Sequence, residues 1–282
     1  MQPPDSSQVR ELVARALDED YRGRDLSTEA ALEPGQPGCG RLVAREPGVV
    51  CGLPVAREVF RQVGQELRCR ALVEDGAAVA RGEALMRLEG PAAALLAGER
   101  VALNFVQRLS GIATLTSRFV ARAAPLGVVI LDTRKTTPGL RQLERYATRV
   151  GGARNHRLGL FDAVLLKDNH IDLAGGMAAA LARACRRVPP GEVEVEVRTP
   201  EELAQALPFG VGRVLLDNFT PEQVRSAIGT TAGRCQVEVS GGVTLENLDA
   251  YLASRPDFIS VGQLTHSPPA LDVAMEVTAL RG

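Results

Sequence analysis

The second half of the chain alternates short apolar runs with segments long enough to form a helix, and this alternation restricts the folds that are open to it. Six apolar runs follow Leu126, at residues 128–131, 163–166, 193–197, 214–216, 237–239 and 258–261. Parallel strands need a crossover between them, usually a helix, so strands that alternate with helices predict a parallel sheet. We expect an α/β fold, either a barrel or an open doubly wound sheet.

Polar residues and glycines follow the apolar runs, where the strands would end. In chain order they are Asp132, Arg134 and Lys135, then Lys167, Asp168 and Asn169, then Glu196, then Asp217 and Asn218, then Ser240, Gly241 and Gly242, and finally Gly262. In a barrel these ends form the mouth of the active site, although an open sheet also binds ligands at its strand ends. Because the glycines come late in the series rather than after the first strand, the pattern favours the barrel.

One strand candidate, EVEVEV at 192–197, alternates glutamate with valine. Side chains alternate between the faces of a strand, so Glu192, Glu194 and Glu196 share one face. If the valine face packs under helices, the glutamates point into the barrel, where each carboxylate needs a cation or a hydrogen-bond donor. Glu196 would then lie nearest the mouth. The alternative is an edge strand whose glutamates are in water.

Lysine is rare in this chain. Of its 33 lysine and arginine residues only Lys135 and Lys167 are lysine, and both follow an apolar run. Lysine supplies a compact, mobile point charge where a planar guanidinium does not fit, so both are candidate site residues. Several arginines converging on one ligand would indicate more than one negative group on it. The other candidate cations are Arg100, Arg134, Arg154, His156 and Arg157.

Two glycine sites suit a phosphate. Gly241 and Gly242 lie between a strand candidate and a helix that we expect to begin at an N-cap, Thr244. Exposed backbone N–H groups and the positive end of a helix favour an anion there. Gly262, in SVGQLTHS, repeats the arrangement after the next strand. Two further helices should begin at Thr199-Pro200 and Thr220-Pro221, because each offers an N-cap threonine followed by proline.

The first hundred residues are organised differently. Apolar residues recur with a helical period over 9–17, and the stretch 67–90 alternates and turns at Asp75-Gly76 and Arg81-Gly82, as hairpins do. This stretch faintly resembles a biotinyl or lipoyl carrier hairpin, but it contains no lysine to carry the prosthetic group. The absence of this lysine argues strongly against a carrier role.

Composition narrows the function classes. The net charge of −1 over 282 residues argues against a general nucleic-acid binder. Five widely spaced cysteines without a C-x-x-C pair indicate neither a disulfide framework nor a zinc site. The chain lacks a signal-peptide pattern, and no apolar run approaches the ~18 residues of a membrane span. We expect a cytoplasmic protein that binds neither nucleic acid nor membrane.

Several motifs together carry a family resemblance that spans nearly the whole chain. GERVALNFVQRLSGIATLT, LDTRKTTPGLR, GGARNHRLGLFDAVLLKDNH, VEVEV, VLLDNF, VEVSGGV and ISVGQLTHS resemble quinolinate phosphoribosyltransferase. The resemblance implies a type II phosphoribosyltransferase fold with two domains. An N-terminal α/β sandwich would span 1–105, completed by 267–282, and an incomplete, seven-stranded α/β barrel would span 106–266.

The resemblance also implies an activity. Members transfer phosphoribosyl from phosphoribosyl pyrophosphate to quinolinate with Mg²⁺, giving nicotinate mononucleotide, pyrophosphate and CO₂ in NAD biosynthesis. The implied catalytic residues are Lys135, Glu196 and Asp217. The implied quinolinate-binding residues are Arg100, Thr133, Arg134, Lys135, His156, Arg157 and Lys167. Phosphoribosyl pyrophosphate would meet Lys167, Glu196, Asp217, Ser240, Gly241, Gly242 and Gly262.

Two further properties follow from the resemblance. Glu196 and Asp217 would hold Mg²⁺, directly or through water. Arg100 would reach the site of a neighbouring subunit, which requires a homodimer, either alone or within a hexamer. Two other functions stay open: a molybdenum-transport-associated paralogue that acts on another acceptor, and a non-catalytic phosphosugar sensor. The intact TRK and NHR cation sets favour quinolinate.

Overall fold

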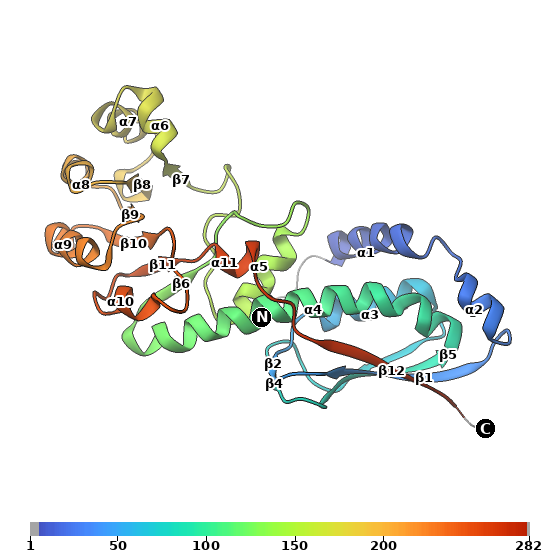
Figure 1. Ribbon diagram of the computed structural model, residues 1–282. Coiled ribbons are helices and arrows are strands. Elements are labelled where there is room, and N and C mark those ends of the chain that lie inside the picture. Colours follow the sequence, from blue (N-terminus) through green and yellow to red (C-terminus); the bar gives the residue numbers. More distant parts are fainter. Residues whose placement is uncertain (1–5, 281–282) are drawn as a thin grey trace. The chain divides into compact units, whose positions relative to one another are not determined.

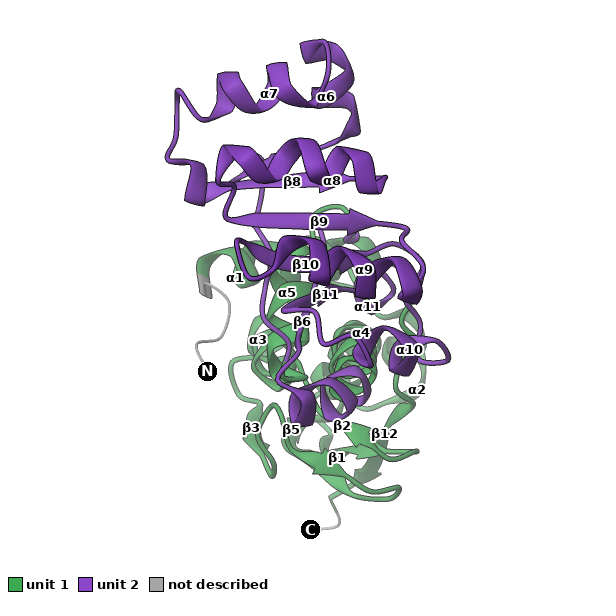
Figure 2. Cartoon of the chain, turned by 90° about the vertical axis from the view of Figure 1, so that its left-hand side faces the viewer, with its two compact units in different colours: residues 1–117, 138–152, 267–282 green, residues 118–137, 153–266 purple. Residues whose placement is uncertain are grey.

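The computed structural model describes residues 6–280 and divides into two compact units. Unit 1 contains Met1–Ser117, Pro138–Gly152 and Ser267–Gly282. Unit 2 contains Arg118–Thr137 and Ala153–His266. The chain therefore leaves unit 1, returns to it between the first two strands of unit 2, and ends in it, as the colours in Figure 2 show.

Unit 1 is built on an antiparallel four-stranded sheet in the order β12-β1-β5-β3, of which β12, β1 and β5 are labelled in Figure 1. A separate antiparallel pair is formed by β2 and β4. β12 pairs with β1 from Ala279 opposite Gly38 to Val273 opposite Ala44, so the end of the chain extends the sheet that its beginning starts. The strands are β1 (Pro37–Ala44), β2 (Gly48–Val49), β3 (Arg68–Ala71), β4 (Ala78–Val79), β5 (Ala84–Pro91) and β12 (Val273–Ala279).

The predicted turns at Asp75-Gly76 and Arg81-Gly82 are present, but the strands around them do not pair as successive hairpins. β3 pairs with β5, and β4 pairs with β2. The alternation of polar and apolar residues locates the turns of a strand region but leaves the choice of partner strand to tertiary packing.

Helices cover one face of the unit 1 sheet (Figure 1). The helical period predicted for 9–17 is confirmed by α1, in which Val13 and Leu17 are buried and contribute to a core shared with Phe60 of α3 and Leu88 of β5. α4 begins in unit 1 and ends in unit 2. The helices are α1 (Ser6–Asp20), α2 (Leu26–Ala31), α3 (Leu53–Val63), α4 (Ala92–Ala123) and α5 (Arg141–Val150).

Unit 2 is built on a parallel sheet of six strands in the order β6-β11-β10-β9-β8-β7. Each of the six apolar runs predicted from the sequence corresponds to one of these strands. The seventh strand of the expected barrel is not confirmed, because the remaining candidate is a single parallel bridge between Leu131 and Arg154. The strands are β6 (Val129–Leu131), β7 (Val164–Leu166), β8 (Val193–Val197), β9 (Arg213–Asp217), β10 (Gln236–Ser240) and β11 (Phe258–Ser260).

Helices follow the strands of unit 2 as predicted. Thr199 caps α8 by accepting the Glu202 N–H, and Thr220 caps α9 by accepting the Gln223 N–H. The prediction of Thr244 as an N-cap is wrong, because a turn follows Gly242 and the next helix begins only at Leu248. The elements are η1 (Ala124–Leu126), α6 (Asp168–Ala174), α7 (Met177–Ala184), η2 (Pro190–Glu192), α8 (Pro200–Ala206), η3 (Leu207–Phe209), α9 (Pro221–Thr231), α10 (Leu248–Leu252) and α11 (Gln263–His266).

The EVEVEV strand is interior rather than an edge, because β8 pairs with both β7 and β9. All five of its residues are buried, so the alternative of solvated edge glutamates is contradicted. Glu194 and Glu196 share a face as predicted, but Glu192 belongs to the preceding 3₁₀ turn and is exposed. The strand therefore buries two carboxylates, each of which needs a partner.

Among the residues described, no helix has both the length and the apolar character needed to cross a membrane.

Candidate active site

Two acidic residues and one lysine lie at the carboxyl ends of neighbouring strands in unit 2. Glu196 precedes the last residue of β8 and Asp217 ends β9, while Lys167 directly follows β7. The Lys167 ammonium donates to a carboxylate oxygen of Glu196, whose side chain is only 6% exposed. The ammonium group of Lys167 thus balances the buried negative charge of Glu196. The pair lies at the strand ends, where the sequence analysis placed the mouth of the active site.

The backbone of Lys167 is held by a histidine three residues further along the chain. Lys167 precedes α6, and its N–H donates to Nδ1 of His170 at 3.0 Å. The ring of His170 thus closes the first turn of α6 and fixes the residue from which the Lys167 side chain departs. His170 is therefore a local support for the site.

The loops after β9 and β10 fit together closely. The Asn218 N–H donates to the carbonyl of Ser240 at 2.8 Å, and the Asn218 side chain donates to Asp217 Oδ2 at 2.8 Å. Gly241 has a φ of +96°, and a Cβ built on it would lie 2.3 Å from Asn218 Oδ1. Gly242, with a φ of +63°, has open space at the same position. Only glycine fits at Gly241, and the turn that follows β10 therefore lies close against Asn218, the residue after Asp217.

The ends of β6 and β11 also meet. The hydroxyl of Thr265 donates to the carbonyl of Lys135 at 2.8 Å, and the Lys135 N–H donates to Thr133 Oγ1 at 3.1 Å. A Cβ on Gly262 would lie 3.2 Å from Lys135 Cδ and 3.2 Å from His266 Cδ2. The structure therefore brings Thr133, Lys135 and Gly262 together, with Lys135 exposed.

His156 is held on both sides by groups within unit 2. Its Nε2 lies 3.4 Å from Glu194 Oε1 and 3.5 Å from Glu238 Oε1. Its backbone N–H donates to Asp132 Oδ1 at 2.8 Å, and Asp132 is fully buried. The N–H of Arg157 donates to His156 Nδ1 at 2.7 Å. The histidine predicted to bind substrate is therefore anchored to the interior of the sheet.

Burial and neighbouring charges shift the pKa values of His156, Glu194 and Glu238 in opposite directions. Burial lowers the pKa of His156, but the hydrogen bonds and charges of Glu194 and Glu238 outweigh it and raise the pKa to about 9. The Arg157 N–H opposes this, since a proton on Nδ1 would break that hydrogen bond. Burial raises the pKa of Glu194. For Glu238 burial is outweighed by His156, Ser260 and Arg213, and its pKa is lowered.

Arg134 and Arg157, both predicted to bind the carboxylates of quinolinate, lie close enough for their charges to interact. Arg157 is buried, and burial lowers its pKa, with the positive charge of Arg134 acting in the same direction. The Arg157 guanidinium donates to the carbonyl of Ala163 at 3.1 Å. Two guanidinium groups whose charges affect each other make a natural place for a ligand with more than one negative charge.

The predicted residues do not all gather in one place. His156, Arg157, Glu194 and Arg213 line a cavity of about 350 Å³ that also reaches the first residues of β8, β9 and β10, whereas Lys167, Glu196 and Asp217 do not line it. Arg100 lies in unit 1, where it is exposed on α4. The structure thus separates the predicted set into strand-end residues, residues of this cavity, and Arg100.

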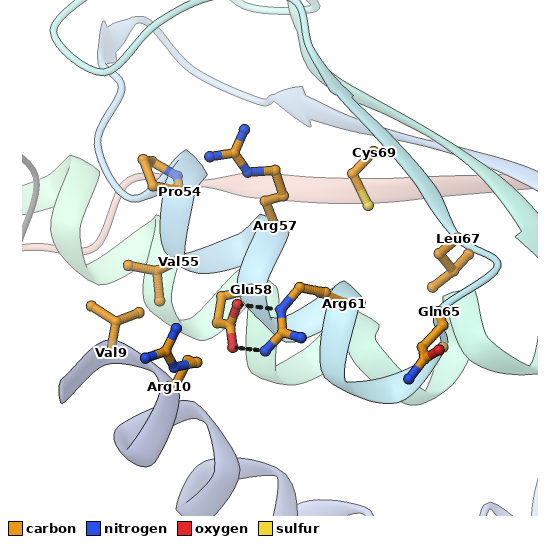
Figure 3. A pocket seen from close by; sticks show the side chains of 11 residues that line it. Val9, Arg10, Pro54, Val55, Arg57, Glu58, Arg61, Gln65, Leu67 and Cys69 are labelled. Atoms are coloured by element: carbon orange, nitrogen blue, oxygen red, sulfur yellow. Dashed lines mark hydrogen bonds and ion pairs between the residues drawn. The ribbon is translucent and has the colours of Figure 1, made fainter. Parts of the chain in front are cut away.

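Unit 1 has a groove of about 420 Å³ between α1, α3 and β3, lined by Arg10, Arg57 and Arg61 among others. Arg61 pairs there with Glu58, with both nitrogen–oxygen distances at 2.7 Å (Figure 3). None of the predicted site residues lines this groove.

Sequence reasoning missed three residues that contact or adjoin the site, of which Glu238 and Ser260 are buried and Arg213 is half-buried. Glu238 is fully buried beside His156, Arg213 donates to it at 2.9 Å, and Ser260 donates to it at 2.5 Å. A signal for Glu238 was present, because it lies between two valines in an apolar run, as Glu194 and Glu196 do. The contacts with Arg213 and Ser260 depend on strand order, which the sequence did not reveal.

The comparisons with known proteins cover almost the whole chain. The family described as quinolinate phosphoribosyl transferase, N-terminal domain, matches residues 25–110, and that described as the C-terminal domain matches residues 112–276. The chain belongs to the quinolinate phosphoribosyltransferase family. A relative from Mycobacterium leprae, named carboxylating nicotinate-nucleotide pyrophosphorylase, is 41% identical over 277 residues, which is 95% of this chain and 97% of that protein.

Solved structures agree with this family membership. The crystal structure of NadC from Streptococcus pyogenes has a TM-score of 0.93 and 38% identity, and the match covers all of both chains. The structure of a nicotinate-nucleotide pyrophosphorylase from Francisella tularensis also has a TM-score of 0.93, with 36% identity and coverage of 98% of each chain. The quinolinate phosphoribosyltransferase resemblance found in the motifs is confirmed.

Proposed function

We propose that this chain transfers phosphoribosyl from phosphoribosyl pyrophosphate to quinolinate and decarboxylates the product, giving nicotinate mononucleotide, pyrophosphate and CO₂. The observation that carries the proposal is the 41% identity, over 95% of this chain, to a carboxylating nicotinate-nucleotide pyrophosphorylase. The presence of both lysines, of the arginines assigned to quinolinate, and of Glu196 and Asp217 supports it. A protein that only senses a phosphosugar would not need all of these residues.

Quinolinate carries two adjacent carboxylates, and we assign its binding to the cations of unit 2 together with Arg100 contributed by a neighbouring subunit. Arg134 and Arg157 supply guanidinium forks, and Lys167 supplies a mobile ammonium group. The other members of this set are Thr133, Lys135, His156 and Arg100. Support comes from the mutual influence of Arg134 and Arg157, which marks a concentration of positive charge in unit 2.

The strand ends suit the phosphoribosyl donor. Ser240, Gly241, Gly242 and Gly262 would hold the 5′-phosphate through backbone N–H groups, and Lys135 would meet the leaving pyrophosphate. Glu196 and Asp217 fit Mg²⁺ because carboxylate oxygens are the ligands this ion prefers, and the two residues lie at the carboxyl ends of neighbouring parallel strands. Bound there, Mg²⁺ would neutralise negative charge on the pyrophosphate.

The chemistry needs positioning and charge stabilisation. The ring nitrogen of quinolinate forms a bond to the anomeric carbon as the bond from that carbon to the pyrophosphate oxygen breaks. Glu196 and Asp217 would stabilise the positive charge that develops on the ribose, which is typically the largest catalytic contribution. The carboxylate next to the ribosylated nitrogen then leaves as CO₂. Its electron pair stays on the ring carbon, stabilised by the adjacent positive nitrogen, until that carbon takes up a proton.

The finer features of the family are part of the same proposal. The sheet of unit 2 and the segment bridged at Arg154 would form the incomplete seven-stranded barrel, and the domains would divide at 105/106 with 267–282 added to the first. The chain would act in the cytoplasm as a homodimer, alone or within a hexamer, with Arg100 reaching the partner's site. Support comes from the exposure of Arg100, which forms no ion pair within residues 6–280.

Product formation tests the activity. The purified chain is incubated with phosphoribosyl pyrophosphate and Mg²⁺, with quinolinate or nicotinate as the acceptor, and nicotinate mononucleotide and pyrophosphate are measured. Product from quinolinate alone supports the proposal. Product from neither acceptor would contradict it and would favour the paralogue or the sensor.

A further inference from the structure

Two buried carboxylates, Glu194 and Glu238, converge on one histidine. They come from different strands, β8 and β10, and each places Oε1 within 3.5 Å of His156 Nε2. Glu238 is fully buried and the side chain of Glu194 is 11% exposed. Burying two carboxylates without compensation would be costly, so both need donors or cations around them, and their position beside a residue assigned to quinolinate suggests a role beyond packing.

The rest of the cluster balances their charge. Arg213 donates to Glu238 Oε2 at 2.9 Å and lies 3.9 Å from Glu194 Oε2, and its guanidinium stacks 4.0 Å from the centre of the Phe258 ring. Ser260 donates to Glu238 Oε1 at 2.5 Å. These contacts fix both carboxylates in place before any ligand binds. The cluster therefore presents a rigid acceptor to the Nε2–H of His156.

Hydrogen bonds also connect the His156 ring and backbone to the neighbouring residues 155 and 157. The His156 N–H is fixed by Asp132, and the Asn155 side chain donates to the other oxygen of Asp132 at 2.5 Å. The neighbouring Arg157 N–H donates to Nδ1 of the same ring. The orientation of the ring thus sets where the backbone of Arg157 lies. That backbone position in turn determines where the Arg157 side chain, which we assign to quinolinate, begins.

We propose that Glu238 and Glu194 are positioning residues for the acceptor substrate: they hold the His156 ring through Nε2–H, and through that ring they hold Arg157 in place for a substrate carboxylate. This inference rests on the proposed function and assigns a role to residues outside the predicted site. In this role both glutamates act through His156 and not through contact with substrate.

A metal centre is the competing explanation of the same cluster. The ligand atoms of His156, Glu194 and Glu238 lie within 4.8 Å of one another. However, Arg213 and Ser260 already donate to Glu238, and the Arg157 N–H at Nδ1 places the ring proton on Nε2, which then has no lone pair for a metal. The geometry points to an ionic network.

The test uses the shape-preserving variant Glu238→Gln. It removes one negative charge at His156. An amide oxygen in place of Oε1 can still accept from Ser260, while the amide nitrogen replaces the oxygen that accepts from Arg213. The expected result is a rise of about tenfold in the KM for quinolinate, the loss expected for one hydrogen bond to a charged group, with the KM for phosphoribosyl pyrophosphate unchanged. The matched control is Asp249→Asn, which neutralises an exposed carboxylate paired with Arg122 in the same unit and should change neither KM.

A double-variant cycle shows whether Glu238 acts through His156. His156→Asn keeps a polar atom near the position of Nδ1 but removes Nε2. If Glu238 acts through the ring, Glu238→Gln adds little to the quinolinate KM once His156→Asn is present. Additive effects of the two changes would overturn the inference, as would an equal rise in both KM values.

Hydrogen exchange separates this inference from the proposed function, since it needs no turnover. Exchange of the backbone amides in residues 154–158 should be faster in Glu238→Gln than in the wild-type protein, and unchanged in Asp249→Asn. Wild-type turnover with unchanged exchange and KM in Glu238→Gln would reject the positioning role alone. Absence of wild-type turnover, with faster exchange in the variant, would reject the proposed function and keep the network.

Discussion

The ammonium group of Lys167 donates to the buried carboxylate of Glu196, so the cation assigned to the acceptor and the acid assigned to the phosphoribosyl donor are partners in one ion pair. The two residues lie at the ends of adjacent strands, β7 and β8. Under the proposed assignments, a substrate carboxylate that binds Lys167 would compete with Glu196 and would free Glu196 for the ribose or for Mg²⁺. Binding of the two substrates would then be coupled through one pair of side chains.

Lys167→Met should lower stability and abolish turnover. It leaves the Glu196 carboxylate buried without its cation, which is strongly destabilising in a fully buried pair. Because the Lys167 side chain is 42% exposed, water screens the pair and the expected loss is about 1–2 kcal/mol. Urea unfolding measures it. Adding Glu196→Gln should restore stability without restoring turnover, and failure of that double variant to recover stability would show that the pair is not the cause.

Glu196→Gln and Asp217→Asn should each reduce kcat by about 100-fold or more, because each removes a charge assigned to the developing positive charge on the ribose. Circular dichroism should show the fold intact in both variants. Asp249→Asn serves again as the charge control. Near-normal turnover in both site variants would refute their assignment.

The sequence predicted the strands of unit 2 well because each carries an apolar run that ends in polar or glycine residues. It located Glu196, Asp217 and Gly241 at strand ends for the same reason. It could not predict the hydrogen bonds between Arg213 and Glu238 or between His156 and Glu194, since these depend on which strands are neighbours and on the path of the loop after β6. Thr244 failed as a helix start because a side chain able to cap also serves a turn.

His156 should make stability depend on pH between about 6.5 and 9. Glu194 and Glu238 raise its pKa on folding, whereas the Arg157 N–H at Nδ1 favours the neutral ring. Where the two carboxylates prevail, the contribution of His156 is fully present below the ordinary value of 6.5 and is lost as the pH rises through about 9. The contribution should reach at most about 3 kcal/mol. Unfolding free energies of the wild-type protein and His156→Asn are compared across this range. Parallel curves would mean that the Arg157 N–H keeps the ring neutral.

Gly241→Ala should weaken binding of phosphoribosyl pyrophosphate far more than Gly242→Ala. Both glycines have a positive φ, so alanine strains the backbone at either position. Only at Gly241 would the new Cβ also meet the Asn218 side chain at 2.3 Å and the Asn218 backbone nitrogen at 2.9 Å. The KM for phosphoribosyl pyrophosphate measures the difference. Equal effects would show that the fit against Asn218 does not shape the site.

Arg100→Ala should raise the quinolinate KM without changing the sedimentation coefficient, and mixing it with Glu196→Gln should restore activity. If each site takes Arg100 from the partner and Glu196 from its own chain, a mixed dimer has one intact site and one with both changes. Random pairing of equal amounts then gives about a quarter of wild-type activity, because half of the dimers are mixed and each has one working site. Co-expression of the two variants provides the exchange of subunits, and each variant alone is the control. A mixture no more active than the average of its parents would place Arg100 and Glu196 in the same chain's site, or Arg100 outside the site altogether.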